Sequence, residues 1–364
     1  NLVLSHFITP RIFRILCPNI ILTEGYEYGS FHFLEPSFLH NYTDSTVKSE
    51  IYARNIHPYF YGTVHPVNEI PLDRHVIYHM SIGCELNHII PDFTGQRWMI
   101  YHNITPDCYF EPYDSHIASL CKQGRTDLAQ MRPYIHMALA DSEYNRQELL
   151  HYGYGNTATA PIILDFDDYD RPTDTELLHW LAGSKQGKDI LFVGRIVPNK
   201  KIEDVVHAFA FYQKHMQPQA RLFLVGTTVI EAYTEEIKRL ARQYLLNIHL
   251  VGHVSFEQLL AYYRNADLFL CMSEHEGFCV PLLEAMHFNV PIVAYNSSAV
   301  GETLGSGGLL VSNKDWVAIA ALMNQVLEDD SLKMRVLNAQ RKRRAAYSKT
   351  NTQKIWWDYL QCLL

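Results

Sequence analysis

From Lys188 onward, short apolar runs alternate with longer segments of helical periodicity. The runs predict buried strands at 189–194, 221–226, 248–252, 267–272, 291–295 and 308–311. The segments between them predict helices at 202–215, 230–246, 256–265, 281–288 and 315–328. This alternation is typical of a parallel sheet covered on both faces, whose strands all end at one edge, where ligands bind.

The first half of the chain shows a less regular version of the same pattern. It predicts strands at 75–80, 97–102 and 137–142 and helices near 114–132 and 142–152. Residues 1–70 have weak periodicity and give no elements. We therefore expect a second α/β layer in this half.

Two further segments suggest how the halves are joined. Residues 155–187, which mix Thr, Pro, Asp and Gly, are typical of an interdomain connection. Residues 352–364 predict an amphipathic helix with two adjacent Trp. This helix has no remaining strand of its own to cover, so we expect it to pack on the first domain.

Composition narrows the class of protein. The chain has 364 residues, long enough for two domains, with 48% hydrophobic and 19% charged residues. The net charge of −8 argues against a nucleic-acid binder. Seven scattered Cys without a CxxC pair argue against a disulfide framework or a zinc ribbon and suit a reducing compartment. No membrane-spanning run and no signal peptide are legible, so we expect a cytoplasmic protein.

The segment FVGRIVPNKKIEDVV (192–206) joins a predicted strand to a predicted helix. The strand ends at Gly194, and Arg195, Lys200 and Lys201 follow at the edge where ligands bind. Cationic groups beside a helix N-terminus favour an anion, because fixed N–H donors and the helix dipole add to the side-chain charges. A solvated basic loop would look similar, but its position at the binding edge favours an anion site.

The segment SEHEGFCVPLLEAM (273–286) places Glu276 and Glu284 on either side of an apolar strand-to-helix corner. Pro281 suits the first turn of the following helix. Acids close to an interior corner are costly to desolvate unless something binds them. Glu284 alone could stabilise the helix dipole as a first-turn acid, but the pair favours a polar ligand.

The backbone of this corner offers the complementary contacts. Amides of the residues between the two acids can face phosphates: Gly277, Phe278, Cys279 and Val280. Carboxylates on opposite sides of a bound diphosphate would accept hydrogen bonds from hydroxyl groups. A ligand with a central diphosphate and hydroxyls at both ends is a nucleotide sugar.

These motifs, with VGRIVPNKK before them and PIVAYNSSAVGETLGSGGLLV after them, resemble the C-terminal domain of retaining GT-B glycosyltransferases. The resemblance is to family four, which makes bacterial surface polysaccharides and lipopolysaccharides, and it covers about residues 188–330. A weaker one extends over VIYHMSIGCELN and WMIYHNITPDCYFEPYD. It implies an α/β GT-B fold, in which two Rossmann-like parallel-sheet domains face each other across a cleft.

The resemblance also assigns the domains. Residues 1–165 would form the acceptor-binding domain and residues 166–345 the nucleotide-sugar-binding domain. Residues 346–364 would form a C-terminal helix that crosses back and packs on the first domain.

The family's site residues carry over to five positions. Glu276 would contact the donor sugar's hydroxyls and Glu284 the ribose hydroxyls. Arg195 and Lys200, with Lys201 beside it, would neutralise the diphosphate. A catalytic His at a strand end would be His102, while His79 is interpreted as structural. Backbone near GHVS (252–255), including Val254, would contact the base.

The implied reaction transfers a hexose from a nucleoside-diphosphate sugar to a glycan or lipid-linked glycan acceptor, with retained configuration. Arg195, Lys200 and the helix amides would stabilise the leaving group. No carboxylate is obviously placed as a nucleophile, so we expect front-face attack. No DxD-type acidic pair follows a strand and the basic residues replace a cation, so we expect no cofactor and no metal. Relatives often act on lipid-linked acceptors, which leaves peripheral contact with the inner face of the cell membrane open. The oligomeric state is unknown.

Two alternatives remain open. A sugar-nucleotide epimerase on the same scaffold would need only the nucleotide sugar and no acceptor. A non-catalytic nucleotide-sugar-binding protein would bind without turnover. A phosphorylase would need a far longer chain.

Overall fold

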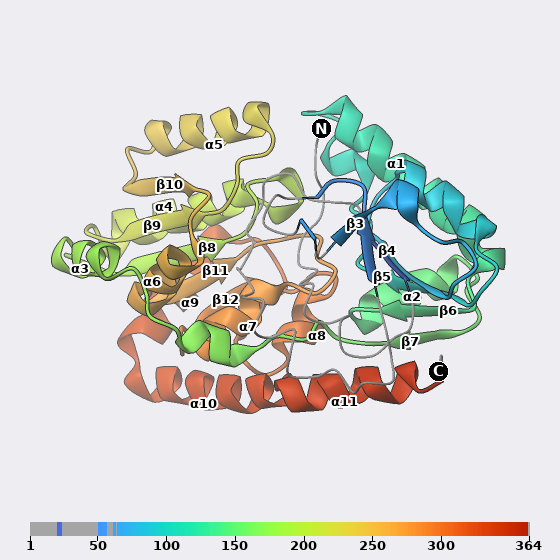
Figure 1. Ribbon diagram of the computed structural model, residues 1–364. Helices are drawn as coiled ribbons and strands as arrows, with labels where there is room; N and C mark the ends of the chain where they lie inside the picture. Colours follow the sequence, from blue (N-terminus) through green and yellow to red (C-terminus); the bar gives the residue numbers. More distant parts are fainter. Residues whose placement is uncertain (1–19, 24–49, 57–60, 63, 363–364) are drawn as a thin grey trace. The chain divides into compact units, whose positions relative to one another are not determined.

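The computed structural model describes residues 20–23, 50–56, 61–62 and 64–362 (Figure 1). The chain divides into two compact units. Unit 1 comprises Asn1–Ile163 and Thr350–Leu364, and unit 2 comprises Leu164–Lys349. Each unit contains one parallel β-sheet.

Unit 1 has a sheet in the order β3-β2-β1-β4-β5-β6-β7 among the described residues. The strands are β1 (Ile20–Thr23), β2 (Glu50–Ala53), β3 (Val64–Pro66), β4 (Val76–Met80), β5 (Arg97–Tyr101), β6 (Met137–Ala140) and β7 (Thr157–Thr159). All neighbouring strands run parallel. The order changes direction between β1 and β4, which makes a topological switch point there.

The helices of unit 1 begin at side-chain caps. Helix α1 (Ser115–Met131) is capped by Asp114, which accepts from the Ile117 amide, and α2 (Glu143–His151) by Ser142, which accepts from the Asn145 amide. Helix α1 packs against the short helices η4 (Glu85–Asp92) and η5 (Asp107–Tyr109), and α2 packs against β6 and β7.

Helix α11 (Lys349–Leu360) completes the core of unit 1. Its Trp356 and Leu360 join one buried cluster with Ile51, Ile77, Trp98, Ile100, Leu139 and Ala160. Trp98 and Ile100 are two positions apart on β5, so they point to the same face of the sheet. The Trp356 Nε1–H donates to the Pro161 carbonyl at 2.8 Å. The C-terminal helix is therefore part of this core.

Unit 2 has a sheet in the order β10-β9-β8-β11-β12-β13. The strands are β8 (Asp189–Val193), β9 (Arg221–Val225), β10 (Ile248–Gly252), β11 (Leu268–Cys271), β12 (Ile292–Tyr295) and β13 (Leu309–Val311). Counted in chain order, this is the 3-2-1-4-5-6 arrangement of doubly wound sheets. Strands β8 and β11 are direct neighbours, and the switch point lies between them.

The helices of unit 2 pack on one another in three sets (Figure 1). Helix α4 (Ile202–His215) contacts α5 (Glu231–Gln243) and α9 (Trp316–Glu328). Helix α3 (Thr175–Gly183) contacts α6 (Phe256–Asn265). Helix α7 (Val280–His287) contacts α8 (Val300–Leu304) and α10 (Asp330–Ala346).

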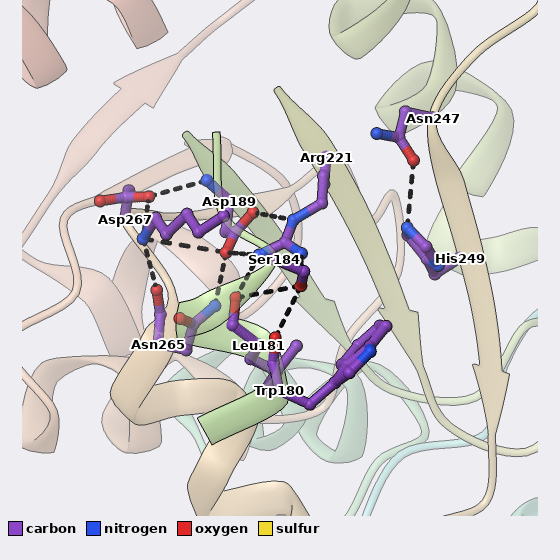
Figure 2. Close-up of polar contacts among 10 residues, drawn as sticks. Trp180, Leu181, Ser184, Asp189, Arg221, Asn247, His249, Asn265 and Asp267 are labelled. Carbon is purple, nitrogen blue, oxygen red and sulfur yellow. Dashed lines mark hydrogen bonds and ion pairs between the residues drawn. The ribbon is translucent and has the colours of Figure 1, made fainter. Parts of the chain in front are cut away.

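A buried polar network connects the N-terminal ends of three strands in the unit 2 sheet (Figure 2). The Arg221 guanidinium binds both carboxylate oxygens of Asp189 at 2.7 and 2.6 Å, a bidentate geometry. It also donates to the Ser184 hydroxyl and the Leu181 carbonyl at the end of α3. Asp267 accepts from the Asp189 amide at 2.7 Å. These contacts align β8, β9 and β11 at the edge opposite their C-terminal ends.

The predicted strands and long helices from residue 188 to 328 are confirmed, with shifts of a few residues at their ends. The interpretation of residues 155–187 as a connection was incomplete, because β7 and α3 lie there. Helix α10 was not predicted, because its surface is polar and only Val336, Leu337 and Gln340 are buried. No helix in the described part of the chain is long and apolar enough to cross a membrane.

Candidate active site

The loop between β11 and α7 carries the first acid of the sequence motif. Strand β11 ends at Cys271, next to β8, whose last residue is Val193. Both strands therefore end at the switch point of the unit 2 sheet, where open α/β sheets bind ligands. Residues that follow β8, including Arg195 and Lys200, share this edge with Glu276.

Glu276 and Lys200 form a largely buried ion pair at this edge. The Lys200 ammonium contacts Oε2 of Glu276. The Glu276 residue is 8% exposed. The pairing compensates the charge of each group, which desolvation would otherwise disfavour. At the switch point, the lysine can bind an anionic group, and the acid beside it can accept hydrogen bonds from hydroxyl groups.

Backbone contacts hold the loop that carries Glu276. The buried Asn199 side chain donates to the His275 carbonyl at 3.0 Å, and the Asn199 carbonyl accepts from the Glu274 amide at 2.9 Å. The Glu276 amide donates to the Ser298 hydroxyl at 2.8 Å. Asn199 and Ser298 thus fix the loop from two sides. Motif spacing alone did not point to either residue.

The turn after β8 positions the cationic groups. Gly194 has φ of +151°, and a Cβ added at the neighbouring Gly226 would lie 2.0 Å from the Gly194 carbonyl oxygen. Glycine therefore permits this close approach of β8 and β9. Arg195 follows directly and is half-buried.

The two lysines of this turn have different partners. Lys201 has left-handed backbone angles, φ 51° and ψ 52°, and precedes α4. Its ammonium contacts Glu203 at 3.0 Å and Glu274 at 3.9 Å. Burial works to lower the pKa of Lys201, but these carboxylates outweigh burial and raise it. Lys200, rather than Lys201, pairs with Glu276.

The N-terminus of α7 follows the same loop. Cys279 is the N-cap residue, and Val280 and Pro281 begin the helix. The first amides of a helix have no partner within it, and the helix dipole adds positive potential there. Gly277 and Phe278 precede this turn, and the Phe278 carbonyl accepts from the Thr303 hydroxyl of α8. The predicted amide segment therefore lies at a helix N-terminus.

Glu284 lies deeper than Glu276. It is 1% exposed, and its Oε1 and Oε2 accept from the Tyr169 and Tyr263 hydroxyls at 2.8 and 2.6 Å. Burial and the nearby carboxylate raise the pKa of both tyrosines well above the usual range, so both remain donors. The two tyrosines were not identified from the sequence, because they lie 115 and 21 positions away.

Val254 lies between β10 and α6 and is half-buried. The capping box of α6, formed by Ser255 and Gln258, follows it directly. This cap fixes the backbone of the segment predicted to contact a nucleotide base.

A second polar cluster lies at the C-terminal ends of β4, β5 and β6 in unit 1. The His102 Nδ1 is 2.7 Å from Oδ2 of Asp141, and its Nε2 is 2.7 Å from Nδ1 of His79. Asp141 and His79 are 4% and 5% exposed. Burial, followed by the proximity of His102, lowers the pKa of His79 well below its usual range.

This cluster changes the interpretation of the histidines. His79 is a direct partner of His102, and the rings stack with centroids 5.0 Å apart. Asp141 was missed, because the predicted strand ran to residue 142 and so included it, whereas β6 ends at Ala140 and leaves Asp141 at the strand's C-terminal end. A carboxylate that accepts from one ring nitrogen fixes the tautomer of the imidazole.

Comparison with known proteins agrees with the unit 2 geometry. The family model described as "Glycosyl transferases group 1" matches residues 178–343. This segment is similar to that family. It contains both acids of the motif and the cationic turn after β8.

Curated relatives match the same region. The capsular polysaccharide biosynthesis glycosyltransferase CapM of Staphylococcus aureus is 28% identical over 167 residues, covering 45% of this chain and 43% of that protein. The O-antigen chain mannosyltransferase B of Escherichia coli is 32% identical over 143 residues, covering 39% and 37%. The matches thus span less than half the length of these relatives.

Solved structures extend the likeness beyond this segment. A sucrose-phosphate synthase from Thermosynechococcus elongatus has a TM-score of 0.72 at 16% identity, covering 94% of this chain and 98% of that chain. HepE of Anabaena, in complex with UDP and glucose, has a TM-score of 0.69 at 14% identity, covering 94% and 98%. The fold is GT-B, built from two Rossmann-like domains.

Proposed function

We propose that the protein is a retaining glycosyltransferase that moves a hexose from a nucleoside-diphosphate sugar to a hydroxyl of a surface glycan or glycolipid. The observation that carries the proposal is the Lys200–Glu276 ion pair at the switch point of the unit 2 sheet, within the segment similar to the group 1 family. In this proposal, Lys200 is the cation that binds phosphate, and Glu276 beside it accepts hydrogen bonds from sugar hydroxyls.

In this proposal the diphosphate binds between the cationic turn and α7. Arg195, Lys200 and the first amides of α7 hold the phosphate oxygens. These groups are fixed before the reaction, so they stabilise negative charge on the leaving group without reorganisation. Glu276 accepts from hydroxyls of the sugar, and Glu284 from those of the ribose. The Tyr169 and Tyr263 hydroxyls already donate to the Glu284 carboxylate. The ribose hydroxyls would therefore share this carboxylate with the two tyrosine hydroxyls.

The chemical step exchanges one bond for another. The bond between the anomeric carbon and the phosphate oxygen breaks, and its electron pair stays on the diphosphate. The acceptor oxygen forms the new bond on the same face, and its proton passes to a phosphate oxygen of the leaving group. Glu276 is held by Lys200, which disfavours its use as a nucleophile, so front-face attack is the favoured route.

Unit 1 would serve the acceptor. His102 is held by Asp141 and His79, so its ring is fixed without help from a ligand. In this proposal, His102 is the catalytic residue of unit 1. The cationic side chains take the place of a divalent metal at the diphosphate, so the reaction needs neither metal nor cofactor.

The acceptor and the cellular compartment are part of the same proposal. The capsular and O-antigen names of the curated relatives support a bacterial glycan acceptor. None of the six described cysteines forms a disulfide, which suits the cytoplasm. Contact with the inner face of the membrane would follow if the acceptor is lipid-linked.

The test is acceptor-dependent release of nucleoside diphosphate. UDP-, GDP-, ADP- and TDP-hexoses are each incubated with lipid-linked and soluble oligosaccharides, and the first-formed anomer is identified by NMR. We expect turnover with one donor and a product that keeps the donor's configuration. An inverted product contradicts the retaining mechanism. Sugar conversion without acceptor indicates an epimerase, and nucleotide-sugar binding without any turnover indicates a non-catalytic binder.

A further inference from the structure

Two buried thiols lie beside the proposed donor acid. Cys271 is the last residue of β11 and Cys279 is the N-cap of α7. Their Sγ atoms and a Glu276 carboxylate oxygen lie within 4.8 Å of one another. Cys271 and Cys279 are 2% and 7% exposed. The proposed transfer reaction uses neither thiol.

Cys279 has an unusual backbone conformation. Its φ is +71°, in the left-handed region that disfavours side chains and favours glycine. A glycine would relieve this conformation, yet the chain places a thiol there, directed at Cys271 and Glu276. Strained residues of this kind cluster at functional sites.

We propose that Cys271, Cys279 and Glu276 form a binding site for a zinc-type divalent metal ion. Two sulfur ligands select borderline or soft metals such as Zn²⁺, whereas Mg²⁺ and Ca²⁺ prefer oxygen ligands. Sulfur atoms that bind zinc tetrahedrally at about 2.3 Å lie roughly 3.8 Å apart. The three donor atoms need only small movements to reach that geometry. The fourth position is left for a water molecule or a phosphate oxygen.

The charges of the cluster also fit a divalent ion. Without metal, the Glu276 carboxylate is balanced by Lys200. Metal binding converts two S–H groups to thiolates, releases two protons and adds one divalent cation. The net charge of the buried cluster therefore stays the same, so binding adds no uncompensated buried charge.

Proton release makes the affinity depend on pH. Cys279 faces Cys271, Glu276 and Lys200. Release of two protons corresponds to an affinity that rises about 100-fold per pH unit while both thiols are protonated.

A bound metal would inhibit sugar transfer, a consequence that rests on the proposed function. A metal on Glu276 removes the acceptor that the sugar hydroxyls would use and competes with Lys200 for the carboxylate. Transfer would therefore be metal-independent yet sensitive to zinc.

The binding test uses Co²⁺ as the probe, because thiolate coordination gives a charge-transfer absorption band. We expect one Co²⁺ per chain, displacement by Zn²⁺, and release of about two protons per ion. Cys271→Ser and Cys279→Gly should each weaken binding at least about 10-fold. Cys279→Gly also suits the left-handed backbone, so loss of folding is not expected. The control is the Cys108→Ser/Cys362→Ser double variant, which removes two exposed thiols and should keep the band.

The outcomes separate the site from the proposed function. No band in the natural chain, a band that persists in both cluster variants, or a band lost in the control would overturn the site. Inhibition by Zn²⁺ should occur in the natural chain and weaken in Cys271→Ser. If Co²⁺ binds as expected but no donor is turned over, the site stands and the glycosyltransferase proposal fails. If Zn²⁺ binds and transfer is unaffected, the inhibitory role is wrong.

Discussion

The Nδ1 atom of His102 lies 2.7 Å from the Asp141 carboxylate, across 39 positions of the sequence. The two residues follow β5 and β6, so adjacent strand ends bring them together. His79, from the end of β4, occupies the other ring nitrogen of His102. The candidate site in unit 1 is therefore a connected row of three side chains, His79, His102 and Asp141.

Asp141→Asn should lower turnover with little change in the donor's Michaelis constant. The amide keeps the shape but removes a charge-assisted hydrogen bond, worth about 1.5–3 kcal/mol, or roughly 10- to 150-fold in kcat. Steady-state kinetics across pH are the measurement. Asp127→Asn is the matched control, because Asp127 is also a buried acid of unit 1 with a histidine partner, but its contacts are to His88, Asn87 and Gln123 rather than to His102. Equal effects of both variants would mean that Asp141 is only structural.

Glu276→Gln should lower turnover while the free nucleoside diphosphate, which lacks the sugar, binds nearly normally. The reason is that Glu276 is expected at the sugar ring, whose charge changes during transfer. Calorimetry with the nucleotide is compared with steady-state kinetics. Glu328→Gln is the control, because this unit 2 acid pairs with Lys188, which precedes β8 at the opposite edge of the sheet. Loss of nucleotide binding in Glu276→Gln would reverse the roles assigned to the two motif acids.

Tyr263→Phe should destabilise the fold by about 1.5–3 kcal/mol, because it removes a donor from the buried Glu284 carboxylate. It should also raise the donor's Michaelis constant through misplacement of Glu284. Urea unfolding and steady-state kinetics measure the two effects. Tyr212→Phe is the control, because the buried Tyr212 hydroxyl has no hydrogen-bond partner among the described residues. A Tyr263→Phe variant as stable as this control would contradict the assigned role.

Stability should fall as the pH drops below about 6.5, the ordinary pKa of histidine. Burial lowers the pKa of His79 in the folded chain, so the unfolded chain binds more protons in that range. The free energy of unfolding then falls by up to about 1.4 kcal/mol per pH unit, down to the folded-state pKa. Thermal unfolding between pH 7.5 and 5.5 measures this pH dependence of stability. The natural chain is compared with His79→Gln, and His116→Gln, at an exposed histidine, is the control. An unchanged slope in His79→Gln argues against the prediction.

EDTA should leave sugar transfer intact, because Arg195 and Lys200 supply positive charge at the diphosphate. The measurement is initial rate with and without chelator. A sample inhibited by added Zn²⁺ and restored by EDTA is the control for chelation. If EDTA abolishes activity and Mn²⁺ restores it, the phosphate site has been misassigned.

Much of unit 2 was predictable from local sequence. Buried parallel strands are continuous apolar runs, so β8 to β13 were recognised from their composition alone. Because such strands end at one edge, the positions of Arg195, Lys200 and Glu276 at that edge also followed. Helix α10 was not recognised, because only a narrow stripe of it is buried.

The sequence by itself determined which residues would be buried in strands and which polar residues would follow them. Only the tertiary structure decided their partners: Lys200 with Glu276 across 76 positions, Tyr169 with Glu284 across 115, and Asp141 with His102. The physical reason is that periodicity records the environment of each residue along its own element. Contacts between elements depend on strand order and on the close packing of side chains from distant segments, which no local pattern contains.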